Sequence, residues 1–289
     1  MLSYVSIMRK ELTQAINAAL TKCSGLKLTP PVCPGSFDGR RTGRQAGGAT
    51  EFADYRAYRE GDELRRVDWR LFARNDQLMV RQFARETDPR CDLILDCSDS
   101  MSFYHKMEAA AGLGAVFARS AAASGFSLHV WALHDEVRKI EPAADPPTWE
   151  LPDTGSRSNP PETLNLAAPG FFRQGMRILI SDLLFEELPE KVLRLLAPGA
   201  AAVIQLLGHE ELDPALSGLV TLTDPETEEE KGIEAGEELL RRYRNNLENF
   251  RRKWEESCSS YQALFFTFDA AQLTGSWDMT PFCRGGLLQ

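Results

Sequence analysis

A short apolar run leads into a polar motif at residues 91–101, which read CDLILDCSDSM. The first six residues are apolar enough to form a strand buried inside a sheet. The run ends at Asp96, and Ser98 and Ser100 follow with the spacing Asp-x-Ser-x-Ser. Because ligands of open α/β sheets bind beyond the carboxyl ends of the strands, we expect a functional site here.

Apolar strands and helices alternate from this stretch to the end of the chain. The helix over 103–124 is rich in alanine and precedes Gly125, and two further helices are predicted at 187–197 and 239–254. Strands are predicted at 91–96, 126–133, 176–181, 201–207 and 261–268. This alternation predicts an α/β fold with a doubly wound, mostly parallel sheet that carries helices on both faces.

The sequence before residue 89 has a different character. Apolar residues three or four positions apart predict an N-terminal amphipathic helix, which we expect to pack on the main body. Residues 25–50 are rich in proline and glycine and indicate a loop or linker. Arginines, acids and aromatic residues then alternate, with a strand predicted at 78–87. We therefore predict two domains, residues 1–88 and residues 89–289.

Composition excludes several functional classes. The chain has 289 residues and a formal net charge of −9, which argues against a nucleic-acid partner held by bulk positive charge. Six cysteines without close-paired spacing indicate a reducing compartment. The sequence contains no apolar run long enough to insert directly into a membrane, so we expect a cytoplasmic protein.

The motif after the first strand is similar to the metal-ion-dependent adhesion site of von Willebrand factor A domains. That resemblance implies Ser98 and Ser100 as direct ligands, and Asp96 and Asp182 as ligands or as partners of bound water. A threonine from another loop completes such sites, and Thr163 and Thr154 are both candidates here. The set of hard oxygens suits Mg²⁺, with Mn²⁺ or Ca²⁺ as alternatives. It would leave a coordination position open for the carboxylate of a partner.

Other interpretations of these residues remain open. The side chains of Asp96, Ser98 and Ser100 could simply cap the helix that follows. Phosphoryl-transfer enzymes also place an aspartate at the end of a first strand, but the dehalogenase type needs a second acid where this chain has Ser98. A P-loop motif is absent, and the four histidines are scattered.

A longer pattern resembles the bacterial family called domain of unknown function 58. Its blocks cover most of the chain and are matched by Gly48–Phe52, Arg56-Ala57-Tyr58, Gly61-Asp62, Arg65–Trp69, Ala73-Arg74, Leu95–Met101, Ser181–Leu184, Thr223–Thr227 and Tyr243 with the helix around it. The resemblance implies a von Willebrand A-like domain preceded by an arginine-rich segment. It also implies partnership with a MoxR-type AAA+ ATPase in the chaperone-like maturation or regulation of client proteins. No catalytic reaction comes with it.

From these observations we expect a non-enzymatic adaptor that binds other proteins through a metal site. The alternative is a metal-dependent hydrolase or phosphatase with Asp96 as its nucleophile. In the arginine-rich segment we expect Asp62 and Asp68 to pair with arginines in a partly buried network, with Trp69 buried beside it.

Overall fold

The chain forms two compact units, which are described separately. The computed structural model describes residues 2–29, 51–58, 67–75, 77–84, 90–152, 160–167, 175–185, 187–197, 199–223 and 230–289. The first unit, here called the sheet unit, joins Met1–Ser36 to Pro89–Gln289. The second, the arginine-rich unit, comprises Phe37–Asp88.

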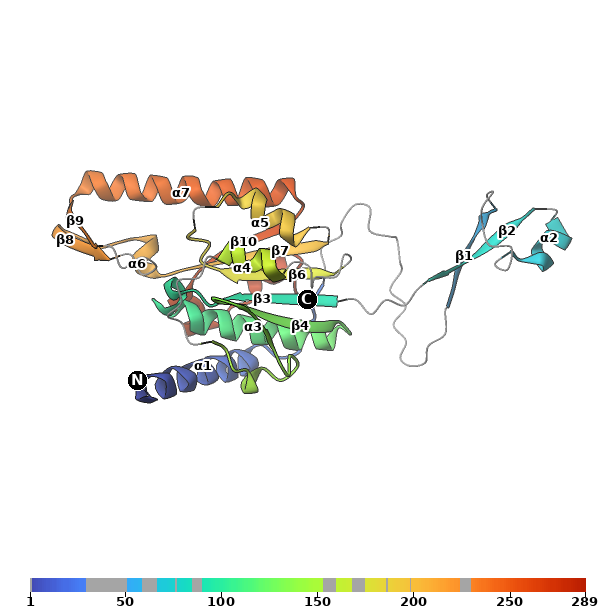
Figure 1. The fold of residues 1–289 in the computed structure, drawn as a ribbon, viewed down its shortest axis with the longest axis horizontal. Helices are drawn as coiled ribbons and strands as arrows, with labels where there is room; N and C mark the ends of the chain where they lie inside the picture. Colours follow the sequence, from blue (N-terminus) through green and yellow to red (C-terminus); the bar gives the residue numbers. More distant parts are fainter. Residues whose placement is uncertain are drawn as a thin grey trace. The chain divides into compact units, whose positions relative to one another are not determined.

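A six-stranded sheet forms the centre of the sheet unit, in the order β10-β7-β6-β3-β4-β5 (Figure 1). All neighbouring strands are parallel except β5, which is antiparallel to β4 at one edge. The strands are β3 (Arg90–Asp96), β4 (Ser127–Leu133), β5 (Val137–Ile140), β6 (Met176–Ser181), β7 (Ala200–Leu207) and β10 (Leu264–Asp269). This confirms the doubly wound, mostly parallel α/β fold expected from the sequence.

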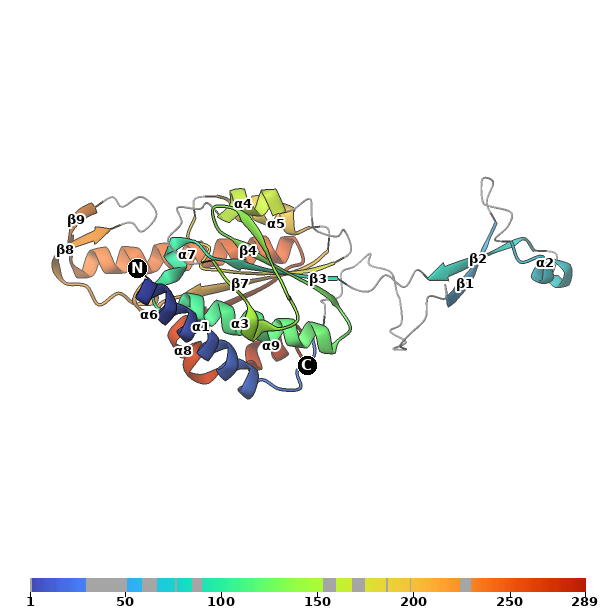
Figure 2. The ribbon, with the colours of Figure 1, turned by 60° about the horizontal axis from the view of Figure 1, so that its bottom comes forward.

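The strands supply two hydrophobic cores, because successive strand residues point to opposite faces of a sheet. Leu93 and Leu95 enter one core, whereas Ile94 between them enters the other. The first core is covered by α1 (Leu2–Lys22), α3 (Lys106–Ala123), α8 (Ala270–Ser276) and α9 (Thr280–Arg284). The second is covered by α4 (Pro160–Ala167), α5 (Pro189–Leu196) and α7 (Glu237–Ser260). Figure 2 shows helices on both sides of the strands.

Helix α1 packs against α3 as an outer layer of the sheet unit. Its apolar stripe, which includes Leu12, Ile16 and Leu20, is buried there. The packing follows the expectation that this helix rests on the main body. The compact units also divide the chain differently from the expected boundary at residue 88, because Met1–Ser36, which includes α1, groups with the α/β domain.

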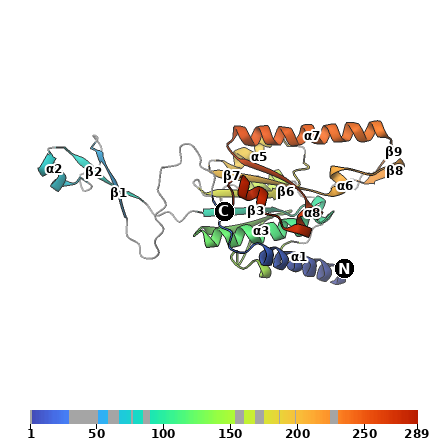
Figure 3. The same ribbon diagram turned by 180° about the vertical axis from the view of Figure 1, so that it is seen from behind.

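A projecting arm lies at the carboxyl ends of the parallel strands. It consists of α6 (His209–Leu212), the hairpin of β8 (Gly218–Thr223) and β9 (Glu230–Ala235), and the first turns of α7. Figures 1 and 3 show the hairpin and these turns extending past the sheet. The alternation of strands and helices in the sequence did not predict this hairpin, since most of its residues are exposed and carry no core pattern.

The arginine-rich unit contains an antiparallel pair of strands and a short helix. They are β1 (Glu51–Ala57), β2 (Met79–Ala84) and α2 (Trp69–Asn75). Asp68 is buried and caps α2, because its Oδ1 accepts hydrogen bonds from the backbone N–H groups of Arg70 and Leu71. The expected burial of Trp69 is wrong: its side chain is 55% exposed at the start of α2. Asp62 lies outside the described residues.

Within the described part of the chain, none of the helices is both long enough and apolar enough to span a membrane.

Candidate functional site

The path of the chain places its switch point between β3 and β6. From β3 the chain passes through α3, on one face, to β4 on one side of β3. After β5 it returns through α4, on the opposite face, to β6 on the other side of β3. Connections that diverge in this way leave a crevice at the carboxyl ends of the two strands. Asp96 ends β3, and Asp182 directly follows β6.

Asp96 organises the loop after β3 from a fully buried position. Its Oδ1 accepts a hydrogen bond of 2.9 Å from the backbone N–H of Ser98, and its Oδ2 accepts one of 2.6 Å from the Ser181 hydroxyl. The hydroxyl oxygens of Ser98 and Ser100 lie 3.1 Å apart in the same loop. The carboxylate therefore joins the ends of β3 and β6 and holds the loop that carries both hydroxyls.

Asp182 is fixed by contacts on both its side chain and its backbone. Its Oδ2 accepts a hydrogen bond of 2.8 Å from the Nζ of Lys106, and its Oδ1 accepts one of 3.2 Å from the N–H of Leu184. Its carbonyl oxygen accepts a hydrogen bond from the side-chain amide of Gln205 on β7, 3.1 Å away. Since Asp182 is 2% exposed, these contacts hold its carboxylate in one position.

Lys106 connects Asp182 to a third carboxylate. Its Nζ also lies 2.7 Å from Glu211 Oε1, and the lysine side chain is completely buried. Glu211 Oε2 in turn accepts a hydrogen bond of 2.7 Å from the N–H of Gly208, which follows β7. We call Asp96, Ser98, Ser100, Lys106, Ser181, Asp182 and Glu211 the strand-end cluster.

Negative charge exceeds positive charge in the strand-end cluster. It contains the carboxyl groups of Asp96, Asp182 and Glu211 and the single ammonium of Lys106. Burial and the neighbouring Asp182 raise the pKa of Asp96 to about 7, although hydrogen bonds from Ser181 and Ser98 lower it. Burial lowers the pKa of Lys106, but the Asp182 and Glu211 carboxylates outweigh burial and raise it overall. Lys106 is therefore a permanent cation, and Asp96 is the carboxyl group whose charge is least compensated.

Four of the expected site residues lie together at the strand ends. Asp96, Ser98 and Ser100 share one loop, and Asp182 lies at the end of the adjacent strand. Thr163 is buried in α4, a helix that packs against β4, β5 and α5. Thr154 lies outside the described residues. In the described part of the chain, no three His, Cys, Asp or Glu residues form a group able to hold a metal ion. A cation here would therefore rely on hydroxyl oxygens as well as carboxylates.

The sequence analysis did not identify Lys106 and Glu211 as site residues, although the sequence pattern around each of them was informative. Lys106 falls on the stripe of α3 that also contains the buried residues Ala109, Ala110 and Leu113. A lysine in such a position is seldom buried without an acidic partner. Glu211 stands three residues after Gly208, the position from which a glutamate side chain can accept from the backbone N–H at the start of a helix.

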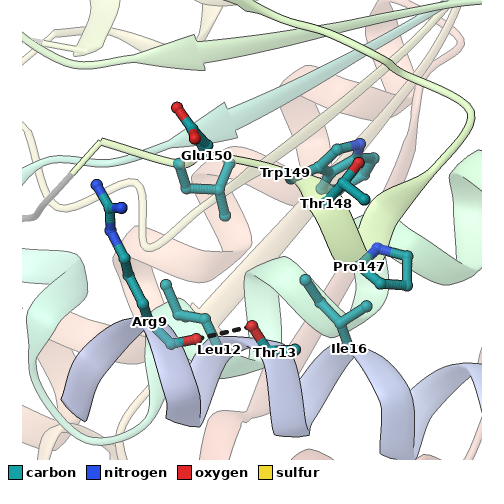
Figure 4. Close-up of a pocket in the computed structure, with 9 residues that line it drawn as sticks. Arg9, Leu12, Thr13, Ile16, Pro147, Thr148, Trp149 and Glu150 are labelled. Atoms are coloured by element: carbon teal, nitrogen blue, oxygen red, sulfur yellow. Dashed lines mark hydrogen bonds between the residues drawn. The ribbon is translucent and has the colours of Figure 1, made fainter. Parts of the chain in front are cut away.

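A separate small cavity lies between α1 and the segment before α4 (Figure 4). Its volume is about 110 Å³, and Arg9, Leu12, Ile16, Trp149 and Glu150 are among its lining residues. It shares no residue with the strand-end cluster.

Comparison with known sequences supports the expected family. Residues 54–149 match the sequence model of the family described as Protein of unknown function DUF58. The matched span runs from within β1 to beyond β5, and it includes Asp96, Ser98, Ser100 and Lys106. The resemblance stated from the sequence motifs is thus confirmed over about a third of the chain. No curated protein matches it.

Several solved structures show distant similarity. The conserved hypothetical protein BatB from Bacteroides thetaiotaomicron is 14% identical, with 68% of this chain and 99% of that chain covered and a TM-score of 0.35. An aerotolerance-related membrane protein from Bacteroides fragilis is 10% identical, with 65% and 96% covered and a TM-score of 0.35. A von Willebrand factor type A protein from Catenulispora acidiphila is 17% identical, with 58% and 43% covered and a TM-score of 0.31. None of these similarities is close enough to carry over a function.

Removal of the Lys106 ammonium should strongly destabilise the chain. In Lys106→Met, the buried Asp182 and the partly buried Glu211 would be left without their cation, which should cost about 3–5 kcal/mol in the free energy of unfolding. Adding Glu211→Gln should recover part of this loss, because it removes one of the two uncompensated charges. Urea unfolding measures both effects.

The matched control is Lys139→Met, which removes an exposed ion pair with Glu141. Exposed pairs contribute little, so its stability should be close to that of the wild type. Equal losses for Lys106→Met and Lys139→Met would contradict the role given to Lys106.

The raised pKa of Asp96 predicts a specific pH dependence in the absence of divalent cations. An aspartate that is protonated in the folded chain and ionised in the unfolded chain stabilises folding less as the pH rises from about 4 towards 7. The stability of the wild type relative to Asp96→Asn should therefore fall with rising pH, by about 1.4 kcal/mol per pH unit at most. Urea unfolding in EDTA between pH 5 and pH 8 tests this. A difference that stays constant over that range would show that Asp96 does not titrate there.

Proposed function

We propose that this chain is a non-enzymatic protein-binding adaptor that holds Mg²⁺ in the strand-end cluster and captures an acidic side chain of another protein. The supporting observation is the meeting of Asp96, Ser98 and Ser100 with Asp182 at the switch point of the sheet. The family match and the α/β fold are consistent with a role in protein interaction.

The donor set of the cluster fits a hard divalent cation. Neighbouring ligands in a Mg²⁺ octahedron with bonds of 2.0–2.1 Å lie about 2.9 Å apart. The hydroxyl oxygens of Ser98 and Ser100 are 3.1 Å apart, close to that value. The excess negative charge of the cluster is a second point in favour, since a cation would relieve the conditions that raise the pKa of Asp96.

In this proposal each residue has its own task. Ser98 and Ser100 hold the ion directly, while Asp96 and Asp182 hold it directly or through water, and Thr163 is the candidate fifth residue. Asp96 also orients the loop through the N–H of Ser98. Lys106 keeps Asp182 in place and reduces the negative charge around it. A bound Mg²⁺ would supply a Lewis-acidic position to which a carboxylate of the partner can bind.

The hydrolase alternative receives less support from Asp96. A nucleophilic carboxylate needs a free oxygen that substrate can reach. Both oxygens of Asp96 accept hydrogen bonds from the chain, and the side chain is fully buried. These features favour a role in orienting the loop.

We further propose a MoxR-type AAA+ ATPase as a partner and the cytoplasm as the location, with client proteins matured or regulated by the pair. The ATPase follows from the family resemblance. The cytoplasm is supported by the five described cysteines, which are all free and of which four are buried.

Calorimetric titration of Mg²⁺ tests the metal site. The wild type should bind with saturation, and Ser98→Ala combined with Ser100→Ala should bind at least about tenfold more weakly, because two ligands are lost. Ser102→Ala is the matched control, since it removes a hydroxyl from the same turn that bonds only to the backbone oxygen of Asp99. No binding by the wild type, or equal binding by all three proteins, would contradict the metal site.

Recovery of a purified MoxR-type ATPase from the same organism on the immobilised chain tests the partnership. Recovery should occur with Mg²⁺ and be lost in EDTA and in the Ser98→Ala/Ser100→Ala variant. Equal recovery in EDTA would remove the metal from the interaction, and no recovery under any condition would contradict the partnership.

A further inference from the structure

Exposed apolar side chains lie in the segments next to the strand-end cluster. In the described part of the sheet unit, eight large apolar or aromatic residues are strongly exposed, and five of them lie in segments adjoining the cluster. We call these five the apolar rim: Phe103, Tyr104, Leu184, Leu188 and Tyr243, with exposures of 39–49%. The other three are Leu166 on α4 and Leu219 and Leu222 on the β8–β9 hairpin.

Phe103 and Tyr104 are held in place beside the loop after β3. Met101, just before them, is fully buried and anchors the segment, and the N–H of Phe103 donates to the carbonyl oxygen of Ser100. The centroids of the Phe103 and Tyr104 rings lie 6.2 Å apart. Tyr104 also packs directly on Gly208, where a Cβ atom would come within 2.5 Å of the tyrosine Cβ. Only glycine therefore permits this contact.

The rest of the rim is connected to the cluster by hydrogen bonds and by the chain itself. The N–H of Leu184 donates to Asp182 Oδ1, and the preceding Leu183 is buried with a φ of +62°. Leu188 precedes the first turn of α5. In α7, the hydroxyl of Tyr243 donates to the carbonyl oxygen of Glu211 at 2.6 Å. The rim residues thus lie in the segments that follow β3 and β6 and in α7, next to the largely buried cluster.

The apolar rim and the charge of the strand-end cluster place two requirements on a partner. Aromatic and leucine side chains around a polar centre are typical of interface anchors. The centre carries three carboxyl groups and one ammonium, so it repels an acidic group unless a divalent cation is bound. With the cation in place, the remaining ligand should be a carboxylate.

We infer that the apolar rim and the metal-loaded cluster together bind a protein segment in which an aspartate or glutamate is flanked by large apolar side chains. The inference rests on the proposed function for the carboxylate contact. The proposed function specifies only an acidic residue of the partner. The apolar rim specifies in addition that the residues next to this acid are large and apolar.

Peptide display tests this inference without a known partner. Random 12-residue peptides would be selected on the full chain in Mg²⁺, and the enriched peptides synthesised and titrated. We expect a consensus with an acidic residue next to aromatic or leucine residues. Phe103→Ser combined with Leu184→Ser should weaken binding by about tenfold or more while leaving Mg²⁺ affinity unchanged. Leu166→Ser removes an equally apolar exposed side chain outside the rim and should leave peptide binding unchanged.

The outcomes separate the rim from the proposed function. Acidic peptides that need Mg²⁺ but bind the rim variant equally well would overturn the inference and leave the metal-dependent adaptor intact. Peptides that bind through the rim without an acidic residue, and equally well in EDTA, would overturn the acidic partner and the proposed metal role together. If Mg²⁺ binds but no peptide is enriched, the inference alone is overturned.

Discussion

The buried ammonium of Lys106 is the interaction on which the arrangement of the strand ends depends. It contacts Asp182 after β6 and Glu211 in α6, so one cation from the first turn of α3 joins three segments of the chain. Removing charges from water is costly, and an ion pair of this kind gives little net stability compared with apolar packing. The main effect of Lys106 is on geometry. Because the charges of Asp182 and Glu211 are compensated only when both carboxylates contact the ammonium, the segments that carry them are held at fixed positions.

This alignment gives the site its electrostatic character. Lys106 compensates part of the negative charge, while Asp96, buried beneath the serine loop, is stabilised mainly by hydrogen bonds. Burial and the neighbouring Asp182 carboxylate nevertheless raise the pKa of Asp96, so this group keeps its proton more readily than an exposed aspartate does. The same feature makes the cluster suited to a divalent ion, whose ligands would be the serine hydroxyls that Asp96 already orients.

The surroundings of the cluster point to a macromolecular partner rather than a small substrate. The cavity between α1 and the segment before α4 lies apart from the cluster. Around the cluster, by contrast, apolar side chains are fixed in exposed positions by Gly208, by the Asp182 carboxylate and by the backbone of Glu211. Large exposed apolar groups around a charged centre are typical of a surface that is covered when another protein binds.

The sequence determined the layered fold and the end of the sheet where the site lies. Short apolar runs such as 91–96 and 176–181, alternating with helical patterns, predict the buried strands of such a sheet, and the motif after the first of them marks Asp96, Ser98 and Ser100. The sequence also predicted that Asp182 lies at this site, since it follows the run 176–181 and the carboxyl ends of parallel strands share one edge of the sheet. Tertiary structure alone decided that β6 is the neighbour of β3, that Lys106 faces inward between two acids, and that Trp69 is exposed. The contacts of Lys106 with Asp182 and Glu211 join residues that are 76 and 105 positions apart in the sequence. No local pattern encodes such pairings, because they depend on how the chain returns to the sheet.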